Sequence, residues 1–337
     1  MTTNNLTALN NDLQFNNGVI ESQPINNDLL ESYINFELGN NQSPTTIKTY
    51  LKGRHQFFDY IKANGIIYPT PQTIIDYRTS LQEYLAPNTI NSYLNVVKQF
   101  FKFLQVKRIY PNITLGIKGA KVDRTEPKHK HLCIEQVQEL LAQFDIKSNK
   151  IKPLRDYAII SLMVCCGLRT IEIARANIGD LQEYGNNTVL YVQGKGKIDK
   201  VQYVIVPQMV LNAIRCYLTL RGIKTFADYE KAKNEPLFCN VSNFSNGTRI
   251  VKNSISRLCK EAFKNIGLND ARITAHSLRH TACTLALENG TSLEETQQMM
   301  RHADISTTMI YNHALQREKN KGTNNVANAI FGSKHEE

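Results

Sequence analysis

The first 47 residues contain no lysine or arginine, although the chain of 337 residues carries 40 of these side chains against 30 acidic ones. Residues 1–15 also lack the basic start and apolar core of a secretory signal. The longest nearly apolar run, Tyr157 to Leu168, is about half of the roughly 20 residues that cross a bilayer. The sequence therefore predicts no export and no membrane span, and we expect a cytoplasmic location.

The charge that is present lies in the body of the chain. The net charge is +10, and every lysine and arginine stands at or after Lys48. A basic body favours a polyanionic partner, usually nucleic acid, although a merely basic soluble protein would show the same balance. The length is sufficient for two domains, each with a hydrophobic core.

Motifs for metals and nucleotides are missing as well. The seven cysteines form no CxxC pair, which is typical of reduced thiols packed as small hydrophobic residues. His276 and His280 have zinc-like spacing but no HExxH pattern, so we interpret His280 as a packed or DNA-proximal histidine. The glycine- and lysine-rich turn at 194–197 lacks the GxxxxGK[ST] pattern of a phosphate loop. We expect no metal ion and no cofactor.

The amino-terminal third is predicted to be a tail followed by a helical domain. Residues 1–27 are rich in asparagine and poor in large apolar residues, which indicates a disordered tail. Residues 28–112 show helical spacing, and two helices open with the same pattern, Pro-x-Thr-Ile-x-x-Tyr, at Pro44 and Pro87. Their hydroxyls, Thr46 and Thr89, could contact phosphate at a helix N-terminus, or the pattern could simply start helices well.

Residues 113–131 hold two glycines, a proline and many charges, so we expect a linker. From Lys98 to Lys130 there are nine basic residues and two acidic ones. Such a run is usually a solvated surface, but a basic strap between two DNA-binding lobes would follow the phosphate backbone. The lysines that we assign to DNA in this run, in the first helix and in the later turn are Lys48, Lys98, Lys102, Lys118, Lys121 and Lys197.

Residues 132–315 are predicted to form a larger, mainly α-helical domain. It contains one hairpin, whose strands at 188–193 and 201–206 flank the turn at 194–197 and form a small antiparallel sheet. Residues 316–337 are predicted to be a tail with a short helix, which must bury its apolar face on its own domain or on a neighbouring protomer. The apolar residues of that face are Val326, Ala327, Ile330 and Phe331.

An ordered set of residues in the larger domain suits cleavage of a phosphodiester by a tyrosine. Arg169 and Arg279 would bind the non-bridging oxygens, whose charge grows in the transition state. Tyr311 is the candidate nucleophile, and His276, one helical turn before Arg279, could accept or steer its proton. Lys195 at the hairpin tip could protonate the leaving 5′-oxygen. His302 could donate a further hydrogen bond to the phosphate.

Each of these residues has a plainer explanation when it is taken alone. Arg169 could be an ordinary salt-bridge partner of Glu172, and Lys195 an exposed turn lysine. His302 could cap a helix, and Tyr311 could be a half-buried core residue. The order of the whole set, with each member on the expected kind of element, favours the catalytic interpretation.

Four segments resemble the catalytic motifs of tyrosine recombinases, especially phage and conjugative-transposon integrases and Xer-type recombinases. They are GLR at 167–169, GKGK at 194–197, HSLRH at 276–280 and MRHADISTTMIYNH at 300–313. The resemblance covers roughly residues 28–315. It implies a helical core-binding domain followed by a catalytic domain, with Glu172 orienting Arg169. One residue departs from the family pattern, because Arg301 stands where glycine is usual.

The resemblance also implies a reaction and partners. The protein would bind a double-stranded core site with inverted repeats as a homodimer, and two dimers would form a tetramer. It would exchange strands through a 3′-phosphotyrosine and a Holliday junction without metal or nucleotide, and the role expected first is integration or excision of a mobile element. Xer-like resolution of DNA dimers, a type IB topoisomerase and a DNA-binding factor without catalysis remain alternatives.

Overall fold

The computed structural model describes residues 22–39, 44–122, 130–147, 149–194, 199–241, 247–318 and 320–331. The predictions for residues 1–21, Lys195 and Lys197 lie outside the described residues. The chain divides into two compact units, Met1–Asp123 and Arg124–Glu337, and the division falls within the stretch predicted as a linker. No helix in the described ranges is both long and apolar enough to cross a membrane.

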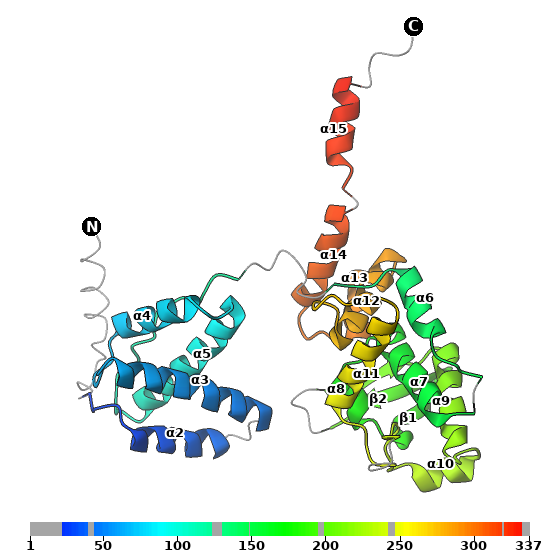
Figure 1. The fold of residues 1–337 in the computed structure, drawn as a ribbon, viewed down its shortest axis with the longest axis horizontal. Helices are drawn as coiled ribbons and strands as arrows, with labels where there is room; N and C mark the ends of the chain where they lie inside the picture. Colours follow the sequence, from blue (N-terminus) through cyan, green and yellow to red (C-terminus); the bar gives the residue numbers. More distant parts are fainter. Residues whose placement is uncertain are drawn as a thin grey trace. The chain divides into compact units, whose positions relative to one another are not determined.

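The first unit is a helical domain (Figure 1), and many of its buried core residues are aromatic. Its helices pack their apolar faces on one another, with α3 lying along α5. Phe57 on α3 meets Tyr77 and Phe101 edge-on, with ring centroids 5.1 and 6.1 Å apart, and such geometry stabilises aromatic pairs. The helices are α2 (Asn27–Gly39), α3 (Pro44–Ala63), α4 (Pro71–Gln82) and α5 (Pro87–Val106).

Residues 113–120 belong to this unit, which differs from the linker that the sequence predicts. Ile113 is 4% exposed in the aromatic core. The Asn91 side chain donates to the carbonyl oxygen of Ala120 and accepts from its N–H, at 2.9 and 2.7 Å. The glycines and charged residues of this segment are typical of a linker, but its hydrogen bonds with Asn91 hold it against α5.

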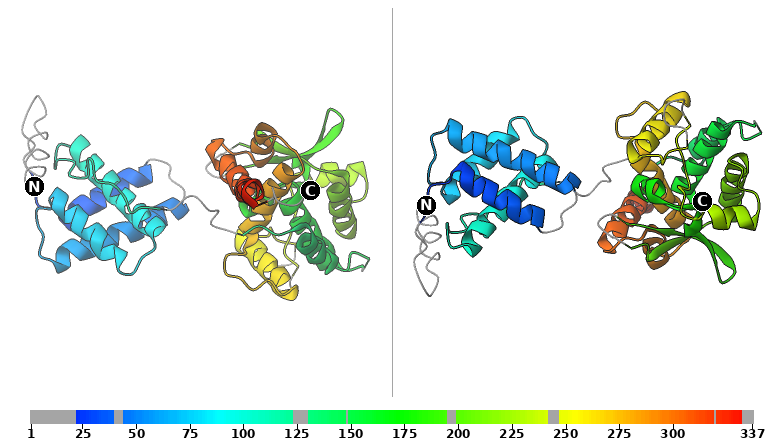
Figure 2. Two further views of the ribbon diagram at one scale, coloured as in Figure 1. Left: turned by 90° about the horizontal axis from the view of Figure 1, so that it is seen from above. Right: turned by 90° about the horizontal axis from the view of Figure 1, so that it is seen from below.

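The second unit is mainly α-helical with a three-stranded antiparallel sheet, as the sequence predicts. Figure 2 shows the sheet at one side of the helical body. The predicted hairpin is present as β2 (Asn187–Val192) and β3 (Gln202–Ile205), with Tyr191 opposite Tyr203. A third strand, β1 (Leu181–Tyr184), pairs with β2. Its side chains are mostly exposed, so no apolar alternation marks it in the sequence.

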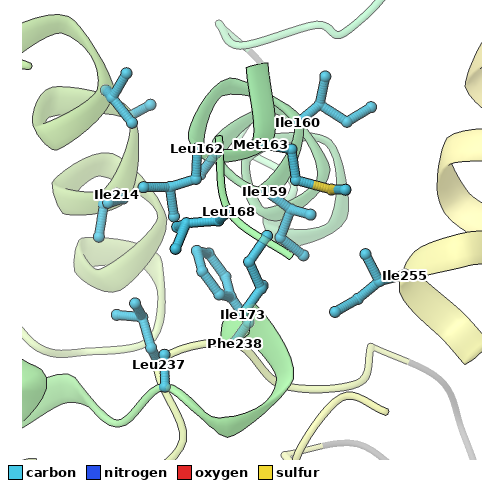
Figure 3. Packing of buried hydrophobic residues seen from close by; sticks show 14 of the residues in the cluster. Ile159, Ile160, Leu162, Met163, Leu168, Ile173, Ile214, Leu237, Phe238 and Ile255 are labelled. Atoms are coloured by element: carbon cyan, nitrogen blue, oxygen red, sulfur yellow. The ribbon is translucent and has the colours of Figure 1, made fainter. Parts of the chain in front are cut away.

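The hydrophobic core of the second unit surrounds α7 (Ile151–Cys165). Figure 3 shows Ile159, Leu162 and Met163 of this helix packed among Phe238 and Ile255, which come from later segments. This packing fixes the end of α7, where the candidate site begins. The other helices are α6 (Ile134–Ala142), α8 (Thr170–Arg175), η1 (Ile178–Asp180), α9 (Gln208–Leu220), α10 (Phe226–Ala232), α11 (Lys252–Asn265), α12 (Ala275–Glu288), α13 (Leu293–Met300), α14 (Ser306–Glu318) and α15 (Gly322–Phe331).

Candidate active site

A glycine turn after α7 places the first site arginine. Gly167 has φ +60°, which side chains rarely adopt. A Cβ atom on Gly167 would lie 2.6 Å from the Met300 sulfur, so any other residue here would also have to displace the Met300 side chain. This close approach brings the α7–α8 turn against the end of α13.

Arg169 begins α8 and is held by Glu172. The Glu172 carboxylate accepts from the Arg169 backbone N–H and from its Nη1, both at 2.8 Å. The Glu172 side chain is fully buried, whereas the Arg169 side chain is 30% exposed and can meet a ligand. Burial raises the pKa of Glu172, but Arg301, the Arg169 N–H and the other guanidiniums more than offset this, so the net pKa is lowered. The carboxylate is therefore ionised.

Arg279 on α12 ties three elements together. Its Nη1 donates to the Gly167 carbonyl oxygen and its Nη2 to the Met300 carbonyl oxygen, and the residue is 3% exposed. Burial and the charges of Arg169 and Arg301 lower the pKa of Arg279 to about 9. The guanidinium remains protonated at neutral pH, and its position is fixed before any ligand binds.

His302 follows α13 and is the neutral donor of the site. Its Nδ1 lies 2.9 Å from the Thr308 hydroxyl of α14. Burial, then the charges of Arg279 and Arg169, lower the pKa of His302 to about 4. When the hydroxyl donates to Nδ1, the proton of the neutral ring sits on Nε2, where it is available to a phosphate oxygen.

Tyr311 lies on α14 with its ring turned toward α12. It is 8% exposed, and its hydroxyl is hydrogen-bonded with Nδ1 of His280, whose ring centroid lies 5.0 Å from the Tyr311 ring centroid. Burial raises the pKa of the Tyr311 phenol above its usual value. Deprotonation of this phenol therefore needs a nearby acceptor.

His280 is a site residue whose role the sequence analysis missed. The ring of His276 lies 4.9 Å from that of His280, one helical turn away, and His276 is exposed. The histidine spacing in HSLRH was the available signal, but it led only to a rejected zinc pattern and to the interpretation of His280 as a packed or DNA-proximal histidine. The three side chains Tyr311, His280 and His276 form a series from the buried phenol toward the surface.

The structure thus brings together every described member of the predicted site, and Lys195 lies outside the described residues. The neighbouring charges that act on His302 include Arg279, Arg169 and His276, which shows that these groups share one region. A cavity of about 650 Å³ opens beside Arg169 and His276. Lys260 and Lys264 of α11 also line it, and the sequence analysis did not single them out.

The residues predicted to bind DNA have mixed surroundings. Lys48, Lys102, Lys118 and Lys121 are exposed, and Thr46 and Thr89 are partly buried. Lys98 is already engaged, because its ammonium donates to the Ile117 carbonyl oxygen at 2.7 Å. Among the described residues, no cluster of histidine, cysteine, aspartate or glutamate could hold a metal ion.

Comparisons with known proteins agree with this geometry. Residues 130–318 match the phage integrase family. Tyrosine recombinase XerC of Alcanivorax borkumensis is 30% identical over 281 residues, which cover 80% of this chain and 84% of the relative. The fold resembles the XerH site-specific recombinase bound to a palindromic difH substrate, with 21% identity, a TM-score of 0.66, and coverage of 81% of this chain and 78% of that one.

A second solved structure shares the fold. It is the Tn1549 transposon integrase in complex with transposon right end DNA, with 20% identity, a TM-score of 0.61, and coverage of 84% of this chain and 93% of that one. The family match spans more than half of the chain, and it includes every predicted catalytic residue. The chain therefore belongs to the phage integrase family and is a tyrosine recombinase, an enzyme of site-specific recombination that breaks and rejoins DNA strands.

Proposed function

We propose that Tyr311 attacks the scissile phosphodiester and forms a 3′-phosphotyrosine, while Arg169, Arg279 and His302 stabilise the transition state. The observation that carries this proposal is the convergence of two fixed guanidiniums and a neutral imidazole around one region. Charge that develops on the phosphate oxygens meets donors that need no reorganisation. The covalent intermediate conserves the energy of the broken bond, so rejoining needs no nucleotide.

Two histidines support the loss of the phenolic proton. The hydrogen bond between Tyr311 and Nδ1 of His280 makes His280 the first acceptor that the phenol meets. His276 lies beside His280 and is exposed, so it can steer the proton onward or contact the phosphate. Because Tyr311 is buried, α14 must shift before the oxygen can reach a phosphate.

We propose that Lys195 protonates the leaving 5′-oxygen. Its neighbour Gly194 is anchored beside the site, because Arg175 of α8 donates to the Gly194 carbonyl oxygen at 3.3 Å. At the other strand, Lys200 pairs with Asp180 at 2.5 Å and donates to the Arg175 carbonyl oxygen. Arg175 therefore bonds to both sides of the hairpin base, and it ends α8, the helix that follows Arg169.

No metal ion is required in this proposal. Arg169, Arg279 and Lys195 would supply the positive charge that a metal supplies in other phosphoryl-transfer enzymes. Every one of the seven cysteines is a free thiol, and a DNA substrate and reduced thiols both suit the cytoplasm, where we place the protein.

Both units would contribute to DNA binding. In the first unit, the exposed lysines Lys48, Lys102, Lys118 and Lys121 offer salt-dependent contacts to phosphates, with Thr46 and Thr89 near helix starts. In the second unit, Lys197 follows Lys195 in the hairpin, and Lys260 and Lys264 line the cavity beside Arg169. Lys98 contributes less than we expect from the sequence, because its ammonium is bound to Ile117.

We propose that a homodimer occupies an inverted-repeat core site and that two dimers form the tetramer that exchanges strands. The support within the chain is α15, whose apolar face is uncovered: Val326, Ile330 and Phe331 are 59, 64 and 79% exposed. A helix of ten residues with such a face is not stable alone in water. Its apolar side chains therefore suit a pocket on a neighbouring protomer.

Integration or excision of a mobile element is the role that we propose first, supported by the fold shared with the transposon integrase. Xer-like resolution of DNA dimers is the second candidate, favoured by the extent of the similarity to XerC over 80% of the chain. A recombination assay with candidate inverted repeats from the flanking DNA separates the two. Integration requires an element end, whereas dimer resolution requires two identical chromosomal sites.

The test of the nucleophile is covalent trapping with Tyr311→Phe. A suicide substrate that loses its 5′ fragment after cleavage holds the native protein on DNA in a denaturing gel. Tyr311→Phe keeps the ring packing and loses the oxygen, so we expect normal DNA binding and no covalent complex. A covalent complex with this variant would move the nucleophile elsewhere, and peptide mapping would then examine Tyr191 and Tyr203.

A further inference from the structure

Arg301 has a backbone conformation that disfavours its own side chain. It ends α13 with φ +52° and ψ +46°, in the left-handed region that glycine adopts most easily. Arg108 is the other described non-glycine residue with positive φ. Such a conformation costs free energy, which interactions of the side chain can offset.

Those interactions are with the catalytic cluster. The Arg301 side chain is 3% exposed, and its Nη2 donates to Glu172 Oε2 at 2.8 Å. The same nitrogen lies 3.3 Å from the Gly167 carbonyl oxygen, which also accepts from Arg279. Nη1 donates to the Met299 carbonyl oxygen at 2.8 Å. Arg301 therefore turns back from its own helix end toward the turn that carries Arg169.

Glu172 is consequently shared by two arginines. One carboxylate oxygen, Oε1, accepts from Nη1 of Arg169, and the other, Oε2, accepts from Arg301 and from the Arg169 backbone N–H. With both oxygens bound, the carboxylate cannot rotate without breaking a charge-assisted hydrogen bond. The direction of the Arg169 guanidinium is set by this carboxylate.

We propose that Arg301 is a positioning residue for strand cleavage, which locks Glu172 and through it aims Arg169 at the scissile phosphate. This proposal rests on the phosphate-binding role of Arg169 proposed above. The Arg301 guanidinium donates to Glu172 and to the Met299 carbonyl oxygen, so the proposal gives it a role on Glu172 and not on the DNA. Its positive charge also keeps Glu172 ionised inside the unit, so that Arg169 always has an anionic partner.

The test compares Arg301→Gly with the native protein in single-turnover cleavage at saturating DNA. Glycine suits the backbone, so the variant removes the guanidinium without adding strain. We expect the cleavage rate to fall by about 10- to 100-fold, in the range that loss of an orienting partner gives, with half-site affinity within about twofold. Arg301→Lys keeps the charge and should recover part of the rate. A glycine variant that cleaves within about twofold of the native rate would overturn the proposal.

A second arm tests the route through Glu172. In the Glu172→Gln background, Arg301→Gly should slow cleavage no further, because the carboxylate that it holds is gone. If Arg301→Gly slowed both backgrounds by the same factor, Arg301 would not act through Glu172. Arg108→Gly is the matched backbone control, since it relaxes the same conformation at a residue of the first unit and reports the effect on melting temperature alone.

Two further measurements distinguish loss of the Arg301 interaction from misfolding of the variant and from failure of the proposed nucleophile. Should Arg301→Gly melt below the assay temperature, Arg301→Asn gives the same comparison, because asparagine also tolerates the left-handed region. Tyr311→Phe is run in parallel. A covalent complex with Tyr311→Phe would refute the proposed nucleophile, while the effect of Arg301 on the cleavage rate would still be measured.

Discussion

Arg279 and Tyr311 lie in the same unit, but several hydrogen bonds hold the Arg279 side chain and one holds that of Tyr311. Arg279 is fixed by carbonyl oxygens from two other segments, and Glu172 joins Arg169 to Arg301. Tyr311 is buried and has one side-chain hydrogen bond, to His280. The groups proposed to bind the phosphate are thus held in place by several hydrogen bonds, whereas the phenol proposed to react is buried and would have to move to reach a phosphate.

Lys195→Ala should produce the largest effect among the proton-handling residues outside the nucleophile. We expect cleavage to slow by about 10³-fold, because a general acid contributes roughly 10²- to 10⁴-fold. A substrate with sulfur in place of the bridging 5′-oxygen should recover most of the rate, since a thiolate leaves without a proton. If the sulfur substrate were equally impaired, Lys195 would act by binding the phosphate and not by donating a proton.

His280→Phe should slow cleavage by about 10²-fold at neutral pH, because the ring is kept and the proton acceptor is lost. Burial raises the pKa of the phenol, so the variant depends on deprotonation by solvent hydroxide. The deficit relative to the native enzyme should therefore narrow as pH rises. His313→Phe, at an exposed position two residues after Tyr311, is the matched control. An equal deficit at every pH would assign His280 a packing role only.

Deletion of residues 324–337 tests whether contact with a neighbouring protomer controls the placement of Tyr311. Half-site binding should stay near normal, because none of the residues proposed to bind DNA lies in the deleted segment. Cooperative occupation of full sites should weaken by about tenfold, in keeping with the loss of a small apolar contact. Gel-shift titrations on half-sites and full sites measure this. Equal cooperativity in the truncated protein would show that the apolar face of α15 does not bind a neighbouring protomer.

Excess EDTA should have no effect on the cleavage rate. The guanidiniums of Arg169 and Arg279 are held by Glu172 and by the Gly167 carbonyl oxygen, and under the proposal their charges make an added cation unnecessary. The measurement is single-turnover cleavage with and without the chelator. If EDTA abolished activity and magnesium or zinc restored it, the two arginines would not supply enough positive charge by themselves. The proposed metal-independent cleavage would then be wrong.

Local sequence determined the fold class and indicated most of the candidate site. The spacing of HSLRH puts His276 and Arg279 one turn apart, and the alternation around the turn at 194–197 predicts β2 and β3. These patterns are readable because helix and strand periodicities depend on neighbours in the chain. The strand β1 and the segment 113–120 were not predicted, since exposed side chains and long-range hydrogen bonds leave no periodic signal.

Only the tertiary structure decided how the site is held. The sequence marks Arg301 as an unusual residue, but its bond to Glu172 joins positions 129 residues apart. The partnership of Tyr311 with His280 likewise depends on how α14 packs on α12. Such contacts arise from burial, which forces polar groups to find partners wherever the fold brings them. The sequence determined which groups could react, and packing determined which of them are fixed and which must move.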